Sequence, residues 1–77
     1  MSMASAYFTI GNMDGKRGAQ RLKRGLDTLP GVQSVSVGAG SGRIAVDFDD
    51  TGVKSENIAQ HIGDMGFRIL GSRTDYR

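Results

Sequence analysis

The stretch that decides the fold is residues 32–48, VQSVSVGAGSGRIAVDF. Apolar and polar residues alternate on both sides of its glycine-rich centre GAGSG, around Val35 before it and around Ile44 and Val46 after it. Such alternation is typical of strands with one buried face, and a short glycine-rich linker favours a turn between antiparallel neighbours. The stretch therefore predicts an antiparallel hairpin in the middle of the chain.

The residues before the hairpin predict a strand followed by a helix. Residues 7–10, YFTI, alternate so that Phe8 faces inward. From residue 15 to residue 29 the spacing changes to steps of three and four, which draw one apolar stripe on a helix: Ala19, Leu22, Leu26 and Leu29. Asp14 is the predicted N-cap, and Pro30 ends the helix because proline cannot continue it.

The residues after the hairpin predict a second helix and a last strand. Ser55 is the predicted N-cap, and Glu56 lies in the first turn, where the helix dipole favours a negative charge. The apolar stripe of this helix consists of Ile58, Ile62 and Met65. Gly66 fits a C-terminal stop, and residues 67–70, FRIL, form a short strand.

The predicted order is strand, helix, strand, strand, helix, strand. Such a chain is expected to be an α+β protein with a ferredoxin-like βαββαβ fold, a two-layer sandwich. A four-stranded antiparallel sheet carries two helices on one face. We expect one domain over residues 7–70, with flexible tails at residues 1–6 and 71–77.

Composition excludes several classes of function. The chain of 77 residues contains no cysteine, which excludes disulfides, zinc fingers and thiolate metal sites. A net charge of +2 is too small for a generic nucleic-acid binder. No segment has the roughly 20 apolar residues of a membrane span, and no secretory signal is visible. The expectation is a cytoplasmic protein, a monomer or weak dimer, with no nucleic-acid or membrane partner.

Several pieces of the chain together resemble the heavy-metal-associated domain of copper chaperones and metal-transporting ATPases. They are FTIGNMDGKRG, LDTLPGV, IAVDFD and IAQHIGDMGF, and the resemblance extends from about Tyr7 to Leu70. In that family the first loop reads glycine-methionine-x-cysteine-x-x-cysteine. Met13 sets the register here, so the two cysteine positions fall on Gly15 and Gly18, and Asn12 replaces the first glycine.

The resemblance implies binding and trafficking of Cu(I) or Zn(II), yet both sulfur ligands are absent. Glycine side chains donate nothing to a metal, and Lys16 and Arg17 inside the motif repel a cation. We therefore expect no bound cofactor. Because the backbone is expected to match the family, Gly15→Cys with Gly18→Cys should create a Cu(I) site with little change in fold.

Other side chains could replace the thiolates only in unusual ways. In the family, the methionine equivalent to Met13 packs beneath the loop. The remaining candidate donors are interpreted as terminal, structural or solvated residues: Met1, Met3, His61, Asp47, Asp49 and Asp50. The open face of the sheet offers Tyr7 as its only aromatic residue, so it lacks a platform for stacking RNA bases. Its other members are expected to be Thr9, Ser36, Ala45, Asp47 and Arg68.

The first helix carries a basic outer face. Arg17, Arg21 and Arg24 recur at helical spacing, and Lys16 lies beside them. This face could be merely solvated, or it could dock an acidic partner protein. The amides of Gly15 and Gly18 at the helix N-terminus, with the adjacent basic residues, also suit an anion. Copper chaperones of the family use the corresponding surface to guide metal to a transporter domain.

Two functions remain open from the sequence. One is a metal-free protein-interaction or regulatory module on a degenerate heavy-metal-associated scaffold. The alternative is a metal-handling protein that uses an unusual non-thiolate site or a site shared across a dimer. No nucleophile, base or carboxylate pair converges in the sequence, so an enzyme is not expected.

Overall fold

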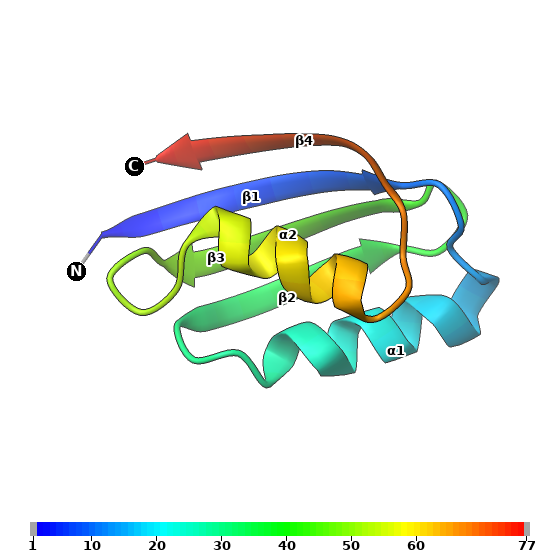
Figure 1. The fold of residues 1–77 in the computed structure, drawn as a ribbon, viewed down its shortest axis with the longest axis horizontal. Coiled ribbons are helices and arrows are strands. Elements are labelled where there is room, and N and C mark those ends of the chain that lie inside the picture. The colour runs from blue at the N-terminus through cyan, green and yellow to red at the C-terminus, as the bar shows by residue number, and fades with distance from the viewer. Residues whose placement is uncertain (1, 77) are drawn as a thin grey trace.

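The computed structural model describes residues 2–76 and contains a four-stranded antiparallel sheet with two helices packed on one face (Figure 1). The strand order is β2-β3-β1-β4, so β2 and β4 form the edges. This confirms the predicted βαββαβ sandwich. The elements are β1 (Met3–Ile10), α1 (Gly15–Asp27), β2 (Val32–Gly38), β3 (Arg43–Asp49), α2 (Ser55–Asp64) and β4 (Ile69–Tyr76). Within the described residues, no helix is long and apolar enough to cross a membrane.

The predicted hairpin forms β2 and β3. Val35 pairs with Val46 in the antiparallel register. The connection ends at Gly42, whose φ of +69° favours glycine. A Cβ at Gly42 would lie 2.7 Å from the carbonyl oxygen of Ile10, and the Ile10 amide donates a 2.7 Å hydrogen bond to the Gly42 carbonyl. The hairpin end therefore packs directly against the end of β1.

The core lies between the sheet and the helices. Leu22 and Leu26 of α1 and Ile58 and Ile62 of α2 are fully buried, as the apolar stripes predict. The strands contribute side chains from one face: Ala4, Ala6, Phe8, Ile10, Val35, Ile44, Val46 and Phe48. The two helices thus cover one face of the sheet and leave the other face, called the open face, uncovered.

The first and last strands of the chain, β1 and β4, are longer than the sequence predicted. Residues 3–6 belong to β1 and residues 71–76 to β4, and the two strands pair from Ala4 opposite Tyr76 onward. The predicted strand boundaries at residues 7 and 70 were therefore wrong. The small side chains at the start of β1 and the mostly exposed side chains of β4 carry no clear hydrophobic alternation. Met1 and Arg77, which were included in the predicted tails, lie outside the described residues.

The helix starts correct two predicted caps. Asp14 occupies the N-cap position of α1, but its side chain makes no capping hydrogen bond. In α2 the N-cap is Lys54 rather than Ser55, which is the first helical residue. The Lys54 amide donates a 3.2 Å hydrogen bond to the side-chain oxygen of Asn57, so the reach-back from the third helical residue stabilises this start.

The end of α2 matches the predicted glycine stop. Gly66 has a φ of +92°, and its amide donates a 2.9 Å hydrogen bond to the Gly63 carbonyl. The Phe67 amide donates to the Ile62 carbonyl at 3.3 Å, which completes a Schellman motif. Phe67 is buried, but it and Arg68 precede β4 instead of opening it. Arg68 therefore does not belong to the strand residues of the open face.

Candidate functional site

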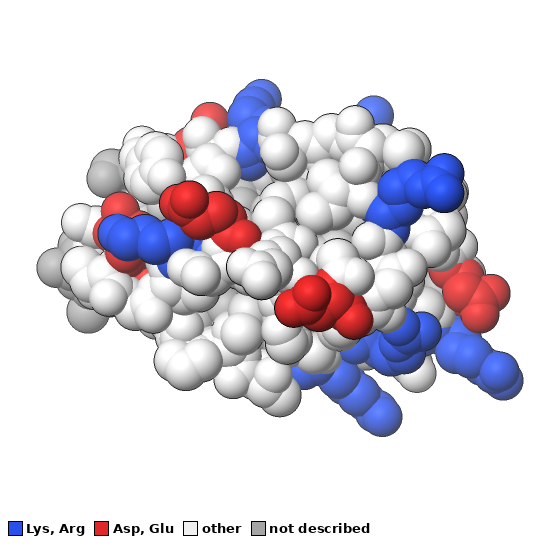
Figure 2. Space-filling model, viewed as in Figure 1, with Lys and Arg blue, Asp and Glu red and all other residues white. Residues whose placement is uncertain are grey.

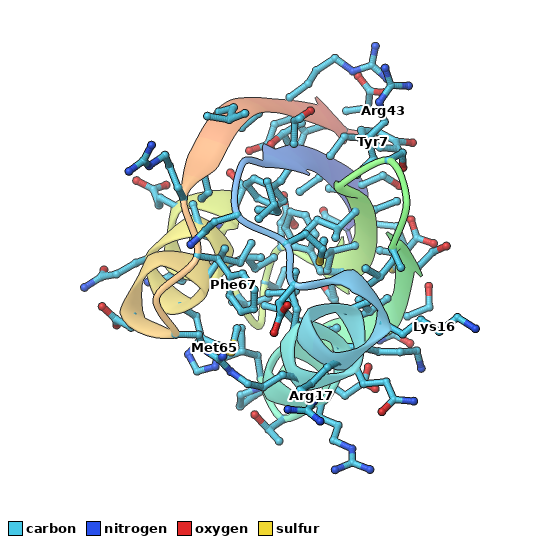
Figure 3. All side chains as sticks on the ribbon, turned by 90° about the vertical axis from the view of Figure 1, so that its right-hand side faces the viewer. Tyr7, Lys16, Arg17, Arg43, Met65 and Phe67 are labelled. Carbon is cyan, nitrogen blue, oxygen red and sulfur yellow. The ribbon has the colours of Figure 1, made fainter. Side chains whose placement is uncertain are left out.

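The segment 11–18, where the family places its metal loop, lies at one end of the sheet. Residues 11–14 connect β1 to α1, and the rest of the segment forms the first turn of the helix. Figure 3 looks onto this end, with Phe67 and Met65 of the α2–β4 connection beside the loop. The Gly11 amide donates a 2.9 Å hydrogen bond to the Arg68 carbonyl.

The side-chain amide of Asn12 fixes the loop to the α2–β4 connection. Its Nδ2 donates a 3.0 Å hydrogen bond to the Gly66 carbonyl, and its Oδ1 accepts a 2.6 Å hydrogen bond from the Arg68 amide. The nitrogen and the oxygen of this one amide therefore both bond to residues that lie more than fifty positions away in the sequence. Sequence reasoning noted Asn12 only as a replacement for glycine, because nothing in the local pattern identifies its distant partners.

Asn12→Gly, which restores the residue of the family motif, is expected to destabilise the fold. Two hydrogen bonds of about 0.5–1.5 kcal/mol each are lost, and glycine adds entropy to the unfolded chain, so we expect a loss of about 1–3 kcal/mol. Urea denaturation monitored by circular dichroism measures it. Gln33→Gly, at an exposed position of an edge strand, controls for the entropy of glycine. Equal losses in the two variants would contradict a fixing role for the Asn12 side chain.

The three predicted metal-loop residues lie close together, in different environments. Met13 is half-buried and packs against the core, as the family resemblance implied. Gly15 is exposed with a φ of +53°, and a Cβ there would meet no atom within 4 Å. Gly18 is buried, and a Cβ there would lie 3.1 Å from the Cβ of Asp14 and 3.7 Å from the Phe67 ring.

The side chain of Arg21 makes two contacts within the domain. Its guanidinium donates a hydrogen bond to the Met65 carbonyl, at the end of α2, and lies 4.8 Å from the centroid of the Phe67 ring. Both contacts connect α1 to the α2–β4 connection. Because the hydrogen bond to the Met65 carbonyl already uses one of its donors, Arg21 has fewer N–H groups left for a partner than an unbound arginine has.

The other predicted basic residues are exposed on α1. Lys16, Arg17 and Arg24 form no ion pair with any described residue. Lys16 and Arg17 point in different directions from the start of the helix (Figure 3). Basic side chains gather along the lower right edge of the molecule, where α1 lies, with an acidic side chain at that end (Figure 2). The helix is therefore basic around much of its exposed circumference.

Most of the chain matches the model of a known domain family. A model of the heavy-metal-associated domain matches residues 7–68. The chain belongs to the heavy-metal-associated domain family. This heavy-metal-associated domain finds no match among curated proteins.

Solved structures of the same fold cover nearly the whole chain. Oxidized MerP from Ralstonia metallidurans CH34 is 17% identical, covers 90% of this chain and 99% of its own, and superposes with a TM-score of 0.80. The yeast copper transporter domain Ccc2a is 21% identical, with 88% and 96% coverage and a TM-score of 0.77. A copper-binding domain from HMA7, a P-type ATPase, is 28% identical, with 95% and 99% coverage and a TM-score of 0.77.

The residues of segment 11–18 do not fit the soft metal ion that the family implies. Gly15 and Gly18 supply no sulfur, and the whole chain contains no cysteine. Cu(I) and Zn(II) bind thiolates, thioethers or imidazoles, whereas backbone carbonyls suit hard cations. Across residues 2–76, no group of three histidine or carboxylate side chains is placed to hold a metal ion.

The other candidate donors lie apart from this segment. His61 is half-buried on α2, beside Met65, where Gly25 of α1 leaves room for both side chains. Met3 lies in β1, half-buried, and Met1 lies outside the described residues. None of these groups joins Met13 in a set of ligands that the structure brings together.

Two of the three candidate carboxylates, Asp47 and Asp49, accept hydrogen bonds from different partners. Asp47 accepts hydrogen bonds from the hydroxyls of Ser5 and Ser34, the latter at 3.0 Å. Asp49 accepts from the hydroxyl and amide of Thr51, at 2.7 and 3.0 Å, and these bonds lower the pKa of Asp49 below its ordinary value. Asp50 follows β3 in the loop. Among the described residues they form no common cation site.

Proposed function

We propose that this heavy-metal-associated domain acts without metal, as a protein-interaction or regulatory module that docks an acidic partner protein on α1. The proposal is supported by a groove of about 390 Å³ between α1 and the edge strand β2, here called the α1–β2 groove. Ala19, Val37 and Ala39 contribute apolar surface to it, and Lys16 and Lys23 stand along its helix side. An apolar groove bordered by cations suits a partner segment that combines small apolar and acidic side chains.

The charges around the groove favour an acidic partner. Lys16 and the nearby Arg17 are exposed and have no ion pair among the described residues. Lys23 contacts Asp27 at 3.7 Å, but both side chains are about half exposed, so this pair is weak and a partner can replace it. Exposed charges of this kind raise association rates more than affinity, and their effect falls with salt.

The position of β2 adds a second support. As an edge strand it offers unpaired backbone groups, to which an extended partner segment can add a strand. The groove, the cations and the free edge lie on one side of the molecule.

Affinity capture with matched charge variants tests the docking surface. Lys16→Gln with Arg17→Gln is expected to reduce capture of an acidic protein from the native lysate by about tenfold, since two rim charges contribute about 0.2–1 kcal/mol each. Lys54→Gln with Arg68→Gln removes the same charge elsewhere and should retain the protein. Capture that is identical for all three proteins, or insensitive to salt, would contradict docking on α1.

Family membership favours the alternative, a metal-handling domain with a non-thiolate or dimer-shared site. Competition titrations of the unmodified protein with Cu(I) and Zn(II) distinguish the two functions. We expect affinity no stronger than that of a free methionine-rich peptide, because no thiolate is present. Stoichiometric binding in the nanomolar range, with or without dimer formation, would replace the metal-free proposal with the alternative.

A further inference from the structure

The open face of the sheet, opposite the helices, has an ordered distribution of charge. The register aligns side chains in rows across the four strands. One row contains Gly38, Arg43, Thr9 and Gly71, and the next contains Ser36, Ala45, Tyr7 and Arg73. In Figure 3, Tyr7 and Arg43 lie together on the outer side of the sheet, far from Lys16 and Arg17.

These two rows surround a shallow depression of about 590 Å³, here called the open-face depression. Its floor is low because Gly38, Ala45 and Gly71 have little or no side chain. Arg43 and Arg73 stand on opposite sides, since they belong to β3 and β4 with β1 between them. A concave surface bordered by two guanidinium groups results.

The residues that line the depression favour an anion. Arg43 and Arg73 are charged, and none of the other lining residues is acidic. Hydroxyl groups of Tyr7, Thr9 and Ser36 add hydrogen-bond donors. Guanidinium groups bind phosphate and carboxylate oxygens in a bidentate way, with stronger hydrogen bonds than neutral donors form.

The two arginines differ in their present contacts. Arg43 has no ion pair with any residue from 2 to 76. Arg73 lies 4.9 Å from the centroid of the Tyr7 ring and 3.4 Å from Asp75, at side chains that are both largely exposed. Stacking on Tyr7 limits the freedom of the guanidinium, so less entropy is lost when its free edge binds an oxyanion. The exposed pair with Asp75 is weak enough to be replaced.

The rest of the open face limits the size of the ligand. The following row contains Ser34, Asp47, Ser5 and Asp75, and Asp49 lies opposite Met3 beyond it. The far part of the face is therefore acidic and repels a polyanion laid across the sheet. This favours a small anion at the arginine rows over a strand of nucleic acid.

We propose that the open-face depression binds the phosphate group of a small phosphorylated molecule between Arg43 and Arg73. The shared chemistry is a tetrahedral dianion, which free phosphate and a phosphate monoester both present. This site lies on the opposite side of the sheet from the helices and does not depend on the proposed partner docking. Binding at the two surfaces can therefore be tested separately.

Chemical-shift titration of the ¹⁵N-labelled protein tests the proposal, with inorganic phosphate and adenosine monophosphate as probes. We expect saturable shifts at the amides of the two arginine rows with both probes, and none when sodium chloride is raised to the same ionic strength. Arg43→Gln with Arg73→Gln should weaken binding at least about tenfold. Replacing both with lysine, which keeps charge but loses the bidentate geometry, should give an intermediate loss.

The controls locate the site and define its ligand. Lys54→Gln with Arg68→Gln removes the same charge outside the depression and should change affinity less than about twofold. Loss of binding in the Lys16→Gln, Arg17→Gln variant instead would place the anion at the start of α1 and overturn the proposal. So would shifts that chloride reproduces, or an oligoadenylate that binds more than tenfold tighter than the monophosphate, which would indicate a nucleic-acid surface. Unchanged spectra with both probes would also refute it.

Discussion

Phe48→Ala is expected to lower the free energy of unfolding by about 3–5 kcal/mol, the range for removing a fully buried aromatic side chain. Phe48 is 0% exposed in β3, between Val32 on one neighbouring strand and Ala4 on the other. A domain of this length typically has about 4–12 kcal/mol in total. The variant should therefore be close to half unfolded at room temperature if the parent lies at the low end. Thermal and urea denaturation measure the loss.

Tyr76→Ala is the matched control for Phe48→Ala. Tyr76 is also an aromatic residue opposite Ala4, on the other side of β1, but it is 66% exposed. Because little of its surface leaves water on folding, we expect a loss below about 1 kcal/mol. Similar losses in both variants would mean that the core is not where the structure places it.

Gly15→Cys with Gly18→Cys is expected to raise Cu(I) affinity at least about 1,000-fold over the parent, with one ion bound per chain. The start of a helix, with Lys16 and Arg17 beside it, lowers thiol pKa values and stabilises the anionic complex of Cu(I) with two thiolates. The same basic residues that repel a free cation thus assist once two thiolates are present. Competition with a chromophoric Cu(I) chelator measures the affinity.

The two cysteines are expected to reduce folding stability more than the sequence suggested. Gly15 has a left-handed φ of +53°, so cysteine there costs about 1–3 kcal/mol or moves the backbone. At Gly18 a Cβ would lie 3.1 Å from the Cβ of Asp14, which must shift by a few tenths of an ångström. The expectation of a backbone already matched to cysteines is therefore corrected at Gly15, whereas at Gly18 only a neighbouring side chain must move. We expect a lower melting temperature without metal, recovered when Cu(I) is added.

A second pair of cysteines controls for thiol content. A Cβ at Gly40 or Gly63 would meet open space, and neither residue has a left-handed φ, so Gly40→Cys with Gly63→Cys adds two thiols at positions far apart in sequence. This variant should not form a one-to-one Cu(I) complex of comparable affinity. If it binds as tightly as the first pair, the spacing and place of segment 11–18 do not matter.

The parts of the fold with strong periodicity could be predicted from the sequence. The helix stripes and the β2–β3 hairpin each show one clear period, and their buried residues are those expected. The ends of β1 and β4 could not, because Ala4 and Ala6 are small and β4 buries little. The end of β4 is a strand because it pairs with β1, and the start of β1 pairs with both β4 and β3, which no local pattern records.

Less of the candidate site could be predicted. The family register could be read from the sequence, and the structure has Met13 in the connection before α1 and Gly15 and Gly18 in the first turns of the helix. The two-sided hydrogen bonding of Asn12 and the contact of Arg21 with Phe67 could not be foreseen, because each joins residues more than forty positions apart. Likewise, Arg43 and Arg73 border the same depression only because β1 pairs with both of their strands.

The left-handed backbone at Gly15 has a consequence for how this domain can change. A sulfur-bearing loop requires two substitutions here, and cysteine at Gly15 strains the backbone before any bound metal can compensate for it. A lone thiol gains no chelate effect, so neither intermediate is favoured over the starting protein. A route that begins with cysteine at Gly15 therefore passes through a less stable protein that still has no complete metal site.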